Sequence, residues 1–194
     1  TAIDYNVEGI YNISDIEVDE EERAYTSLKE IDRVIGGFRE GEVTVWSGEP
    51  GSGKSTILNQ IILEAIEQGG ICAVYSGEST KSNFVKWITV QAMGWSSCVK
   101  VWDKIRERHY YIPSQEALKS FYSSVHGKLF LLEDSGTMKK ETLLEKMKII
   151  AKRNQGNVFV IDNIMQMDLG VGNKNDAQKE FMVELVNFAQ KYNS

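Results

Sequence analysis

Residues 48–55 read Gly-Glu-Pro-Gly-Ser-Gly-Lys-Ser, and this loop constrains the fold more than any other part of the 194-residue chain. The preceding run, residues 42–47, contains Val43 and Val45 and is typical of a buried β-strand. After the loop, apolar residues recur at helical spacing over residues 57–66, and a Gly-Gly pair ends the pattern. A strand, a glycine-rich loop and a helix in this order predict one unit of an α/β fold.

The loop matches the Walker A pattern, in which glycines let successive backbone N–H groups face a phosphate. The N-terminus of the following helix adds the positive end of its dipole. Lys54 is then placed to reach the β and γ phosphates, and Ser55 to ligate Mg²⁺. We therefore expect the chain to bind ATP, or another nucleoside triphosphate, together with Mg²⁺. The predicted nucleotide-binding residues are Gly48, Glu49, Pro50, Gly51, Ser52, Gly53, Lys54, Ser55 and Thr56.

The rest of the chain continues the alternation of strands and helices. Strand-length apolar runs occupy residues 71–76, 128–132 and 158–161, and helical patterns occupy residues 82–93, 139–154 and 177–192. Asn175 and Gln178 have capping-box spacing at the start of the last helix. This order predicts a mainly parallel sheet flanked by helices. Because so apolar a final helix should lead into another strand, we expect the fold to continue beyond Ser194.

The N-terminal part differs in composition from this core. Residues 15–22 are acid-rich with little hydrophobic period, so we assign residues 1–24 to an acidic arm and residues 25–194 to the domain. The net charge is −6, which argues against a globally basic nucleic-acid-binding surface, and no apolar run approaches the ~20 residues of a membrane span. Cys72 and Cys98 form no disulfide framework or metal spacing. A reducing, cytoplasmic setting therefore fits the cysteine usage.

Two acidic strand ends compete for one role at the metal. Asp162 follows the apolar run of residues 158–161, where a carboxylate could hold the Mg²⁺ shell from the tip of a neighbouring strand. Glu133 and Asp134 follow the run of residues 128–132 in the same way. The pattern alone does not separate them.

Glu78 follows the strand predicted at residues 71–76, whose C-terminal end should lie beside the phosphate site. Hydrolysis needs a group that orients the attacking water, since the metal and the lysine only stabilise charge on the phosphates. Glu78 is therefore the candidate catalytic base, although an acid at this place also suits the start of a helix.

Two further segments have open interpretations. Residues 100–111 interleave cations with aromatics, which suits single-stranded nucleic acid, but Asp103 and Glu107 dilute the charge, so we favour a solvated helix or a subunit contact. His109 within it is interpreted as a surface residue. Residues 168–175 form a Gly- and Asn-rich loop that could present Lys174 to a DNA phosphate, and an ordinary surface connection explains it equally well.

Taken together, Gly36-Gly37-Phe38-Arg39-Glu40-Gly41-Glu42 before the loop, Glu78, and Val160-Ile161-Asp162-Asn163-Ile164 resemble the RecA-fold motor of DnaB-type replicative helicases. The lead-in at residues 41–44 and the Asp162-Asn163 pair are most similar to the branch shared by phage primase-helicases and mitochondrial Twinkle. The resemblance covers roughly residues 27–192, and residues 95–126 match it only in general layout.

The resemblance implies a RecA-like P-loop NTPase that forms a hexameric ring, hydrolyses nucleoside triphosphates between subunits and translocates on single-stranded DNA. It also implies a cytoplasmic protein of a bacterial or phage-infected cell, with the mitochondrial matrix as the alternative. Carried onto this sequence, Lys54 and Ser55 bind phosphate and Mg²⁺, Glu78 is the catalytic base, and Asp162 is the Walker B acid. The family's polar sensor, second DNA loop and arginine finger would lie beyond Ser194. We therefore expect this chain to be monomeric or weakly associated and to turn over nucleotide slowly or not at all.

Three rival functions share part of the pattern. A KaiC- or RadA-like ATPase of the RecA superfamily has the same lead-in, the Walker A loop and Glu78. A small-molecule kinase would bring several arginines over the transferred phosphate, whereas only six arginines occur here and three of them precede the loop. A non-catalytic, nucleotide-dependent assembly module would need the loop without Glu78.

Overall fold

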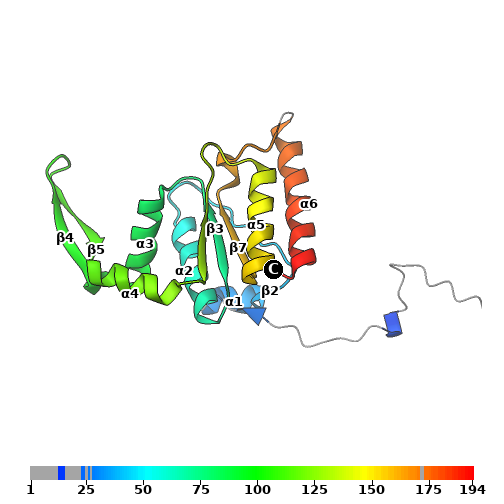
Figure 1. Cartoon of the computed structure of the whole chain (residues 1–194), viewed down its shortest axis with the longest axis horizontal. Coiled ribbons are helices and arrows are strands. Elements are labelled where there is room, and N and C mark those ends of the chain that lie inside the picture. The colour runs from blue at the N-terminus through cyan, green and yellow to red at the C-terminus, as the bar shows by residue number, and fades with distance from the viewer. Residues whose placement is uncertain (1–12, 16–22, 25, 27, 171–172) are drawn as a thin grey trace, which may run out of the picture.

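The computed structural model describes residues 13–15, 23, 24, 26, 28–170 and 173–194, and Figure 1 shows the arrangement of its elements. The acidic arm lies almost wholly outside the described residues. The elements are η1 (Ile13–Asp15), β1 (Arg23–Ala24), α1 (Lys29–Ile35), β2 (Phe38–Arg39), α2 (Lys54–Glu67), β3 (Cys72–Ser76), α3 (Lys81–Met93), η2 (Trp95–Ser97), β4 (Cys98–Asp103), β5 (Arg108–Pro113), α4 (Gln115–Val125), β6 (Leu129–Leu132), α5 (Lys140–Asn154), β7 (Val158–Asp162), η3 (Ile164–Gln166) and α6 (Lys174–Tyr192).

A parallel three-stranded sheet in the order β6-β3-β7 forms the centre of the domain. β3 pairs with β6 from Cys72 opposite Leu129 and with β7 from Cys72 opposite Val158, so it has hydrogen-bonded neighbours on both sides. The parallel α/β architecture predicted from the sequence is confirmed. Each of these three strands lies within one residue of its predicted bounds, because each is an apolar run that the sheet buries.

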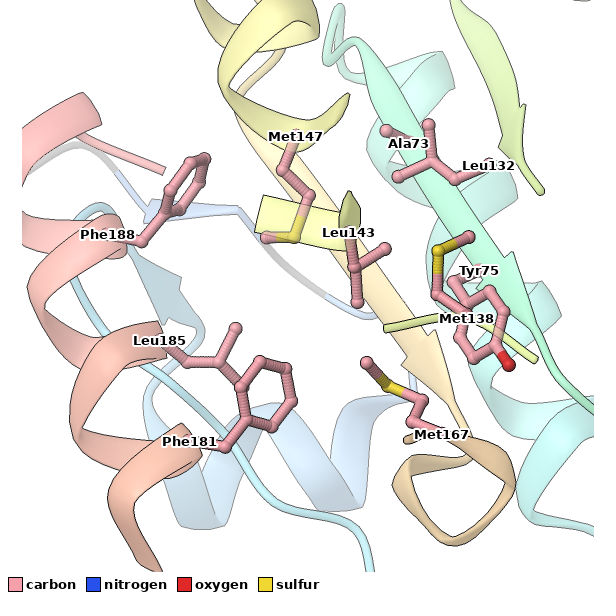
Figure 2. Close-up of a cluster of buried hydrophobic side chains, with 10 residues drawn as sticks. All are labelled: Ala73, Tyr75, Leu132, Met138, Leu143, Met147, Met167, Phe181, Leu185 and Phe188. Carbon is pink, nitrogen blue, oxygen red and sulfur yellow. The ribbon is translucent and has the colours of Figure 1, made fainter. Parts of the chain in front are cut away.

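Helices cover both faces of the sheet, and each face has its own core. The alternation along β3 directs Ala73 and Tyr75 to one face, and Cys72 and Val74 to the other. The first core includes residues of α5 and α6, which lie together on one side in Figure 1, and Figure 2 shows its side chains between those helices and the sheet. The second core receives residues of α2, α3 and α4.

The segment predicted as the first strand, residues 42–47, differs from that prediction. Within the described residues it belongs to no strand ladder, and Val45 is 67% exposed. An apolar groove separates this segment from β7; Val43 and Val45 line one part of it, and Phe159 and Ile161 another. The strand prediction is wrong here because a run of β-forming residues becomes a strand only when a neighbour lies within hydrogen-bonding distance.

Two other local predictions also need correction. Residues 100–111 form the antiparallel hairpin of β4 and β5 instead of a helix. The last helix begins at Lys174, and its N-cap is Asn173, whose side chain accepts a hydrogen bond from the backbone N–H of Asn175 at 3.1 Å. Asn175 is therefore inside the first turn. In the part of the chain that the structure describes, no helix is long and apolar enough to cross a membrane.

Candidate nucleotide-binding site

The glycine-rich loop lies between the segment of residues 42–47 and α2, as the sequence predicts. Lys54 is the first residue of α2, and its ammonium group donates to the carbonyl oxygens of Gly48 and Glu49, at 2.8 and 2.9 Å. The side chain of Lys54 therefore lies across the phosphate loop. A phosphate group in the loop would offer this ammonium group anionic oxygens in place of neutral carbonyls, and charged acceptors form the stronger hydrogen bonds.

The N-terminus of α2 is open to a ligand. Gly53 is its N-cap, has φ 91°, and supplies no side chain to accept the first N–H groups. A residue with a Cβ is strained at such a φ value, which accounts for glycine at this position. After Lys54, the residues Ser55 and Thr56 are exposed in the first turn. Uncapped N–H groups and the positive end of the helix dipole together form a site suited to a phosphate.

Asp162 ends β7 beside the end of β3. The register places it opposite Ser76, and the backbone N–H of Gly77 donates to the carbonyl oxygen of Asp162 at 2.7 Å. A Cβ on Gly77 would come within 2.7 Å of the Cβ of Gln166, so only glycine allows this close approach. This contact holds the ends of β3 and β7 together, and Glu78 lies two residues after the end of β3.

Glu78 and Asn163 meet at this junction. The side-chain amide of Asn163 donates a hydrogen bond to the Oε1 of Glu78, although 85 positions separate the two residues. In the sequence, Asn163 is only part of the pattern that resembles the helicase family, and no role for it follows from that pattern. Its adjacency to Asp162, at the carboxyl edge of a strand that pairs with β3, is the signal that could have identified it as a partner of Glu78.

One cavity of about 920 Å³, which includes the groove between residues 42–47 and β7, joins the predicted residues. The residues of the prediction that line it are Gly48, Pro50, Gly51, Gly53, Lys54, Ser55, Thr56, Glu78 and Asp162. Glu49 and Ser52 belong to the same loop, where the backbone N–H of Ser52 donates to the carbonyl oxygen of Glu49 at 3.2 Å. The fold therefore brings the lysine, the hydroxyl and both candidate carboxylates, which are far apart in the sequence, to one space.

The donors present fit a magnesium ion that is shared with phosphate. Mg²⁺ in such sites usually takes one or two protein oxygens and fills its other positions with phosphate and water. The Ser55 hydroxyl and the Asp162 carboxylate line the same cavity and have this chemistry. Among the described residues there is no group of three or more His, Cys, Asp or Glu side chains that could hold a metal ion.

The competing acids, Glu133 and Asp134, follow β6 and lie elsewhere. β3 separates β6 from β7, and neither Glu133 nor Asp134 lines the cavity. The carboxylate of Glu133 forms an ion pair with Lys81 at 2.5 Å, and its carbonyl oxygen accepts a hydrogen bond from the ammonium group of Lys146. This placement favours Asp162 as the acid beside the phosphate loop.

Lys174, the possible DNA contact, is exposed at the first position of α6. The loop before it is tied to the start of α5, because Asp168 accepts from Lys140 N–H at 3.1 Å and donates to the Met138 carbonyl at 2.9 Å. Lys174 does not line the nucleotide cavity. Its role in binding DNA stays a prediction, and Val171 and Gly172 of the loop lie outside the described residues.

The fold and the cavity define a RecA-like P-loop domain: a parallel sheet flanked by helices, with a glycine-rich loop at a helix N-terminus. Residues 24–193 match the family model of the DnaB-like helicase C terminal domain. Because this match covers most of the chain, the chain belongs to the DnaB-like helicase C-terminal domain family.

Curated proteins similar to this chain are DNA repair proteins. The chain is 27% identical over 161 residues to DNA repair protein RadA of Escherichia coli K12, covering 82% of this chain and 26% of that protein. RadA of Campylobacter jejuni is 27% identical over 161 residues, which cover 78% of this chain and 35% of that protein. RadA of Bacillus subtilis is 38% identical over 69 residues, 35% of this chain and 15% of that protein. The chain thus spans roughly a third or less of these relatives.

Proposed function

We propose that this chain is the ATP-binding and hydrolysing core of a ring-forming replicative DNA helicase, hexameric when complete, that translocates on single-stranded DNA. The observation that carries the proposal is the shared cavity, which brings Lys54, Ser55, Glu78 and Asp162 together. Its membership of the DnaB-like family supports the helicase part of the proposal. Within that family we assign it to the branch of phage primase-helicases and Twinkle, on the lead-in at residues 41–44 and the Asp162-Asn163 pair.

The loop and the first turn of α2 bind the triphosphate. Lys54 exchanges its hydrogen bonds to the Gly48 and Glu49 carbonyls for oxygens of the β and γ phosphates. Ser55 and Asp162 would supply the protein oxygens that hold Mg²⁺. When bound, Mg²⁺ neutralises charge that develops on the phosphate oxygens. Backbone N–H groups of the loop hold the phosphates in the orientation that in-line attack requires.

Glu78 acts on the attacking water. Its carboxylate is exposed at the cavity and can accept a proton or hydrogen bond from a water near the γ phosphate. Asn163 holds one carboxylate oxygen, which limits the rotation of the Glu78 side chain and leaves the other oxygen for the water. Asn163 is thus a positioning residue. Replacement by alanine should lower kcat of the complete protein with little change in KM, whereas a purely structural role would change folding stability instead.

Nucleotide binding is tested on this chain directly. A fluorescent ATP analogue with Mg²⁺ should bind the wild-type chain, bind Lys54→Ala at least ~10 times more weakly, and bind Glu78→Gln with nearly wild-type affinity, because the glutamate acts on the water and not on the phosphates. Lys148→Ala on α5, outside the cavity lining, is the matched control for loss of a lysine. Equal affinities for wild type and Lys54→Ala would contradict the site.

Turnover by this chain alone should be slow. We expect the arginine finger to lie outside this chain, as the resemblance implies, and such a residue increases rates by ~10³ to 10⁵ in related triphosphatases. We therefore expect weak or no steady-state hydrolysis here, and hydrolysis in a form of the protein that extends past Ser194. Rapid turnover by this chain that Glu78→Ala abolishes would overturn this expectation.

The helicase assignment needs a measurement with DNA. ATP hydrolysis by the longer form should rise strongly with single-stranded DNA, and Lys54→Ala should remove both basal and stimulated rates. A forked DNA duplex should then separate in the presence of ATP. Hydrolysis that depends on Lys54 but ignores DNA would exclude a helicase and favour a KaiC-like ATPase. Binding without hydrolysis in the longer form would favour a non-catalytic assembly module.

A RadA-like ATPase that acts in DNA repair is the second candidate. The observation in its favour is the 27% identity to RadA of Escherichia coli over 82% of this chain. Both candidates predict a Lys54-dependent, DNA-stimulated ATPase, so the rate alone does not separate them. Separation of a forked duplex by the longer form supports the replicative motor, whereas DNA-stimulated hydrolysis without strand separation supports the repair ATPase.

A further inference from the structure

The β4–β5 hairpin projects from the body of the domain beyond α3 and α4, far from the ends of β3 and β7 that border the nucleotide cavity (Figure 1). Large hydrophobic side chains are exposed on it and on the preceding turn: Trp95, Val99, Trp102, Ile105, Tyr110 and Tyr111. A two-stranded hairpin is marginally stable alone, and a solvent-exposed concentration of rings on one marks an interaction surface. None of these residues contributes to the nucleotide cavity.

The strand register sorts the side chains onto two faces. Residues directly opposite each other in an antiparallel pair share a face, and Lys100 lies opposite Tyr111 while Trp102 lies opposite His109. Trp102 and His109 pack edge to face with ring centroids 4.7 Å apart, and Trp95 packs in the same manner against Tyr111 at 5.5 Å. We call Trp95, Lys100, Trp102, His109 and Tyr111 the aromatic face.

The opposite face has a different composition. It carries the pairs of Val99 with Ile112, Val101 with Tyr110, and Asp103 with Arg108. It is therefore aliphatic near the body of the domain and has one pair of opposite charges near the turn. Tyr110 on this face and Tyr111 on the aromatic face are similarly exposed, at 44% and 48%. These two neighbouring tyrosines are a natural matched pair for a test.

The two acids that dilute the charge in the sequence do not belong to the aromatic face. The carboxylate of Asp103 accepts hydrogen bonds from the backbone N–H groups of Ile105 and Arg106, at 2.9 and 3.1 Å, and closes the turn. These bonds lower the pKa of Asp103. Glu107 sits in the turn itself, with φ 50°. The aromatic face thus has the ammonium group of Lys100 and no carboxylate.

The hairpin has a net positive charge, whereas the protein as a whole has a net negative charge. Residues 98–113 contain four lysines and arginines against two acids, a net charge of +2 with histidine neutral, whereas the whole chain carries −6. A polyanion is attracted to such a projection and repelled by the rest of the surface. Because bases stack on aromatic rings while cations bind the phosphates between them, alternating rings and cations suit a single strand, whose bases are free to stack.

We propose that the aromatic face of the β4–β5 hairpin binds single-stranded nucleic acid, with bases stacked on Trp102 and Tyr111 and a phosphate bound by Lys100. The single-stranded partner is shared with the proposed function, but this contact requires neither nucleotide nor hydrolysis. The structure therefore changes the interpretation of residues 100–111, for which the sequence favoured a solvated helix or a subunit contact.

The test measures binding of a fluorescein-labelled oligo(dT) by anisotropy at low salt, without ATP. Trp102→Ala and Tyr111→Ala should each weaken binding by roughly 5- to 150-fold, the usual range for loss of one stacked base. Tyr110→Ala, the matched control on the opposite face, should change it less than about twofold. Trp102→Phe should restore part of the affinity because it keeps a ring. Circular dichroism identifies any variant that fails to fold.

The lysine is tested through salt dependence. Lys100→Ala should weaken binding and reduce the slope of log affinity against log salt concentration by about 0.7, the value for one lost phosphate contact on a single strand. Trp102→Ala should leave that slope unchanged. Lys54→Ala should leave oligo(dT) binding unchanged, so failure of the nucleotide site and failure of the hairpin are distinguishable.

Three outcomes would overturn the proposal. The first is no measurable binding of oligo(dT) by the wild-type chain at low salt. The second is equal loss in Tyr110→Ala and Tyr111→Ala, which would indicate that the hairpin is only structurally required. In the third, Trp102→Ala leaves DNA binding intact but lowers the sedimentation coefficient of the protein, and the hairpin is then a contact between copies of the chain.

Discussion

β3 and the segment of residues 42–47 have closely related sequences and different structures. Both are short runs rich in β-forming residues that lead into a loop and then a helix. β3 has hydrogen-bonded partners on both sides, and Cys72, Ala73 and Val74 are at most 1% exposed. Residues 42–47 join no ladder in the described part of the chain, and Val45 is 67% exposed.

The difference shows that whether a run of β-forming residues becomes a strand depends on its neighbours in the fold more than on its own sequence. Burial and pairing reinforce each other in β3, since each hydrogen-bonded neighbour also covers its apolar side chains. The segment before the phosphate loop faces an apolar groove instead, with β7 on the far side. This segment therefore leads into the phosphate loop at Gly48 without the hydrogen-bonded neighbours that a central strand has.

Thiol labelling should show the largest difference between β3 and residues 42–47. In a Cys98→Ser background, Cys72 reports on β3, and an added Val45→Cys reports on residues 42–47. Burial raises the pKa of the Cys72 thiol to about 12, which lowers its thiolate fraction near neutral pH by ~10³ relative to an exposed thiol. The thiol introduced by Val45→Cys should therefore react with iodoacetamide at least ~10³ times faster than Cys72. Mass spectrometry measures both rates. In urea the two rates should converge, and similar rates in the native protein would disprove the contrast.

Alanine substitutions should separate the same regions in stability. Ile62 is fully buried on α2 and packs in the core that β3 shares, so Ile62→Ala should lower the free energy of unfolding by about 2–5 kcal/mol. Val45→Ala should change it by less than about 0.5 kcal/mol, since an exposed side chain loses little burial. Urea titration followed by circular dichroism measures both. A cost of more than about 1 kcal/mol for Val45→Ala would mean that residues 42–47 are packed in solution.

Amide hydrogen exchange should show the same contrast. In the described part of the chain the amides of residues 43–47 belong to no strand ladder, whereas those of Cys72 to Tyr75 lie between β6 and β7. Residues 43–47 should therefore exchange at least ~100-fold faster than Cys72 to Tyr75, as mass spectrometry measures. Equal exchange in the two segments would show that residues 42–47 are paired in solution.

Local sequence patterns predicted those parts of the fold whose structure depends on local chemistry. The runs of β3, β6 and β7 and the helices α2, α3 and α5 were all identifiable, since period and turn residues encode burial directly. The phosphate loop was identifiable for a related reason: each of its positions has a physical task that few residue types fulfil. The placement of Lys54 at the helix start follows from that pattern alone.

The rest depends on contacts that the sequence does not encode locally. Asn163 meets Glu78 across 85 positions, and only the pairing of β3 with β7 brings them together. The hairpin was missed because its two strands mix charged, aromatic and aliphatic residues with no single period, and only the register separates them into two faces. Asn175 has the right residue type for a cap, but Asn173, two positions earlier, has the backbone geometry.

The helices that follow the two compared segments should show the smallest difference. Thr80 caps α3, its hydroxyl accepting a hydrogen bond from Asn83 N–H at 3.3 Å, whereas Gly53 leaves α2 without a side-chain cap. Thr80→Ala should lower the free energy of unfolding by about 1 kcal/mol, the usual cost of losing a cap. It should not alter the rise in Tm that ATP and Mg²⁺ produce, because that rise depends on the open N-terminus of α2. Lys54→Ala should show the reverse, with little change in stability alone and a reduced rise in Tm with nucleotide. If Thr80→Ala also reduced that rise, the two helix N-termini would be coupled and α2 would not be the independent phosphate site that its open end indicates.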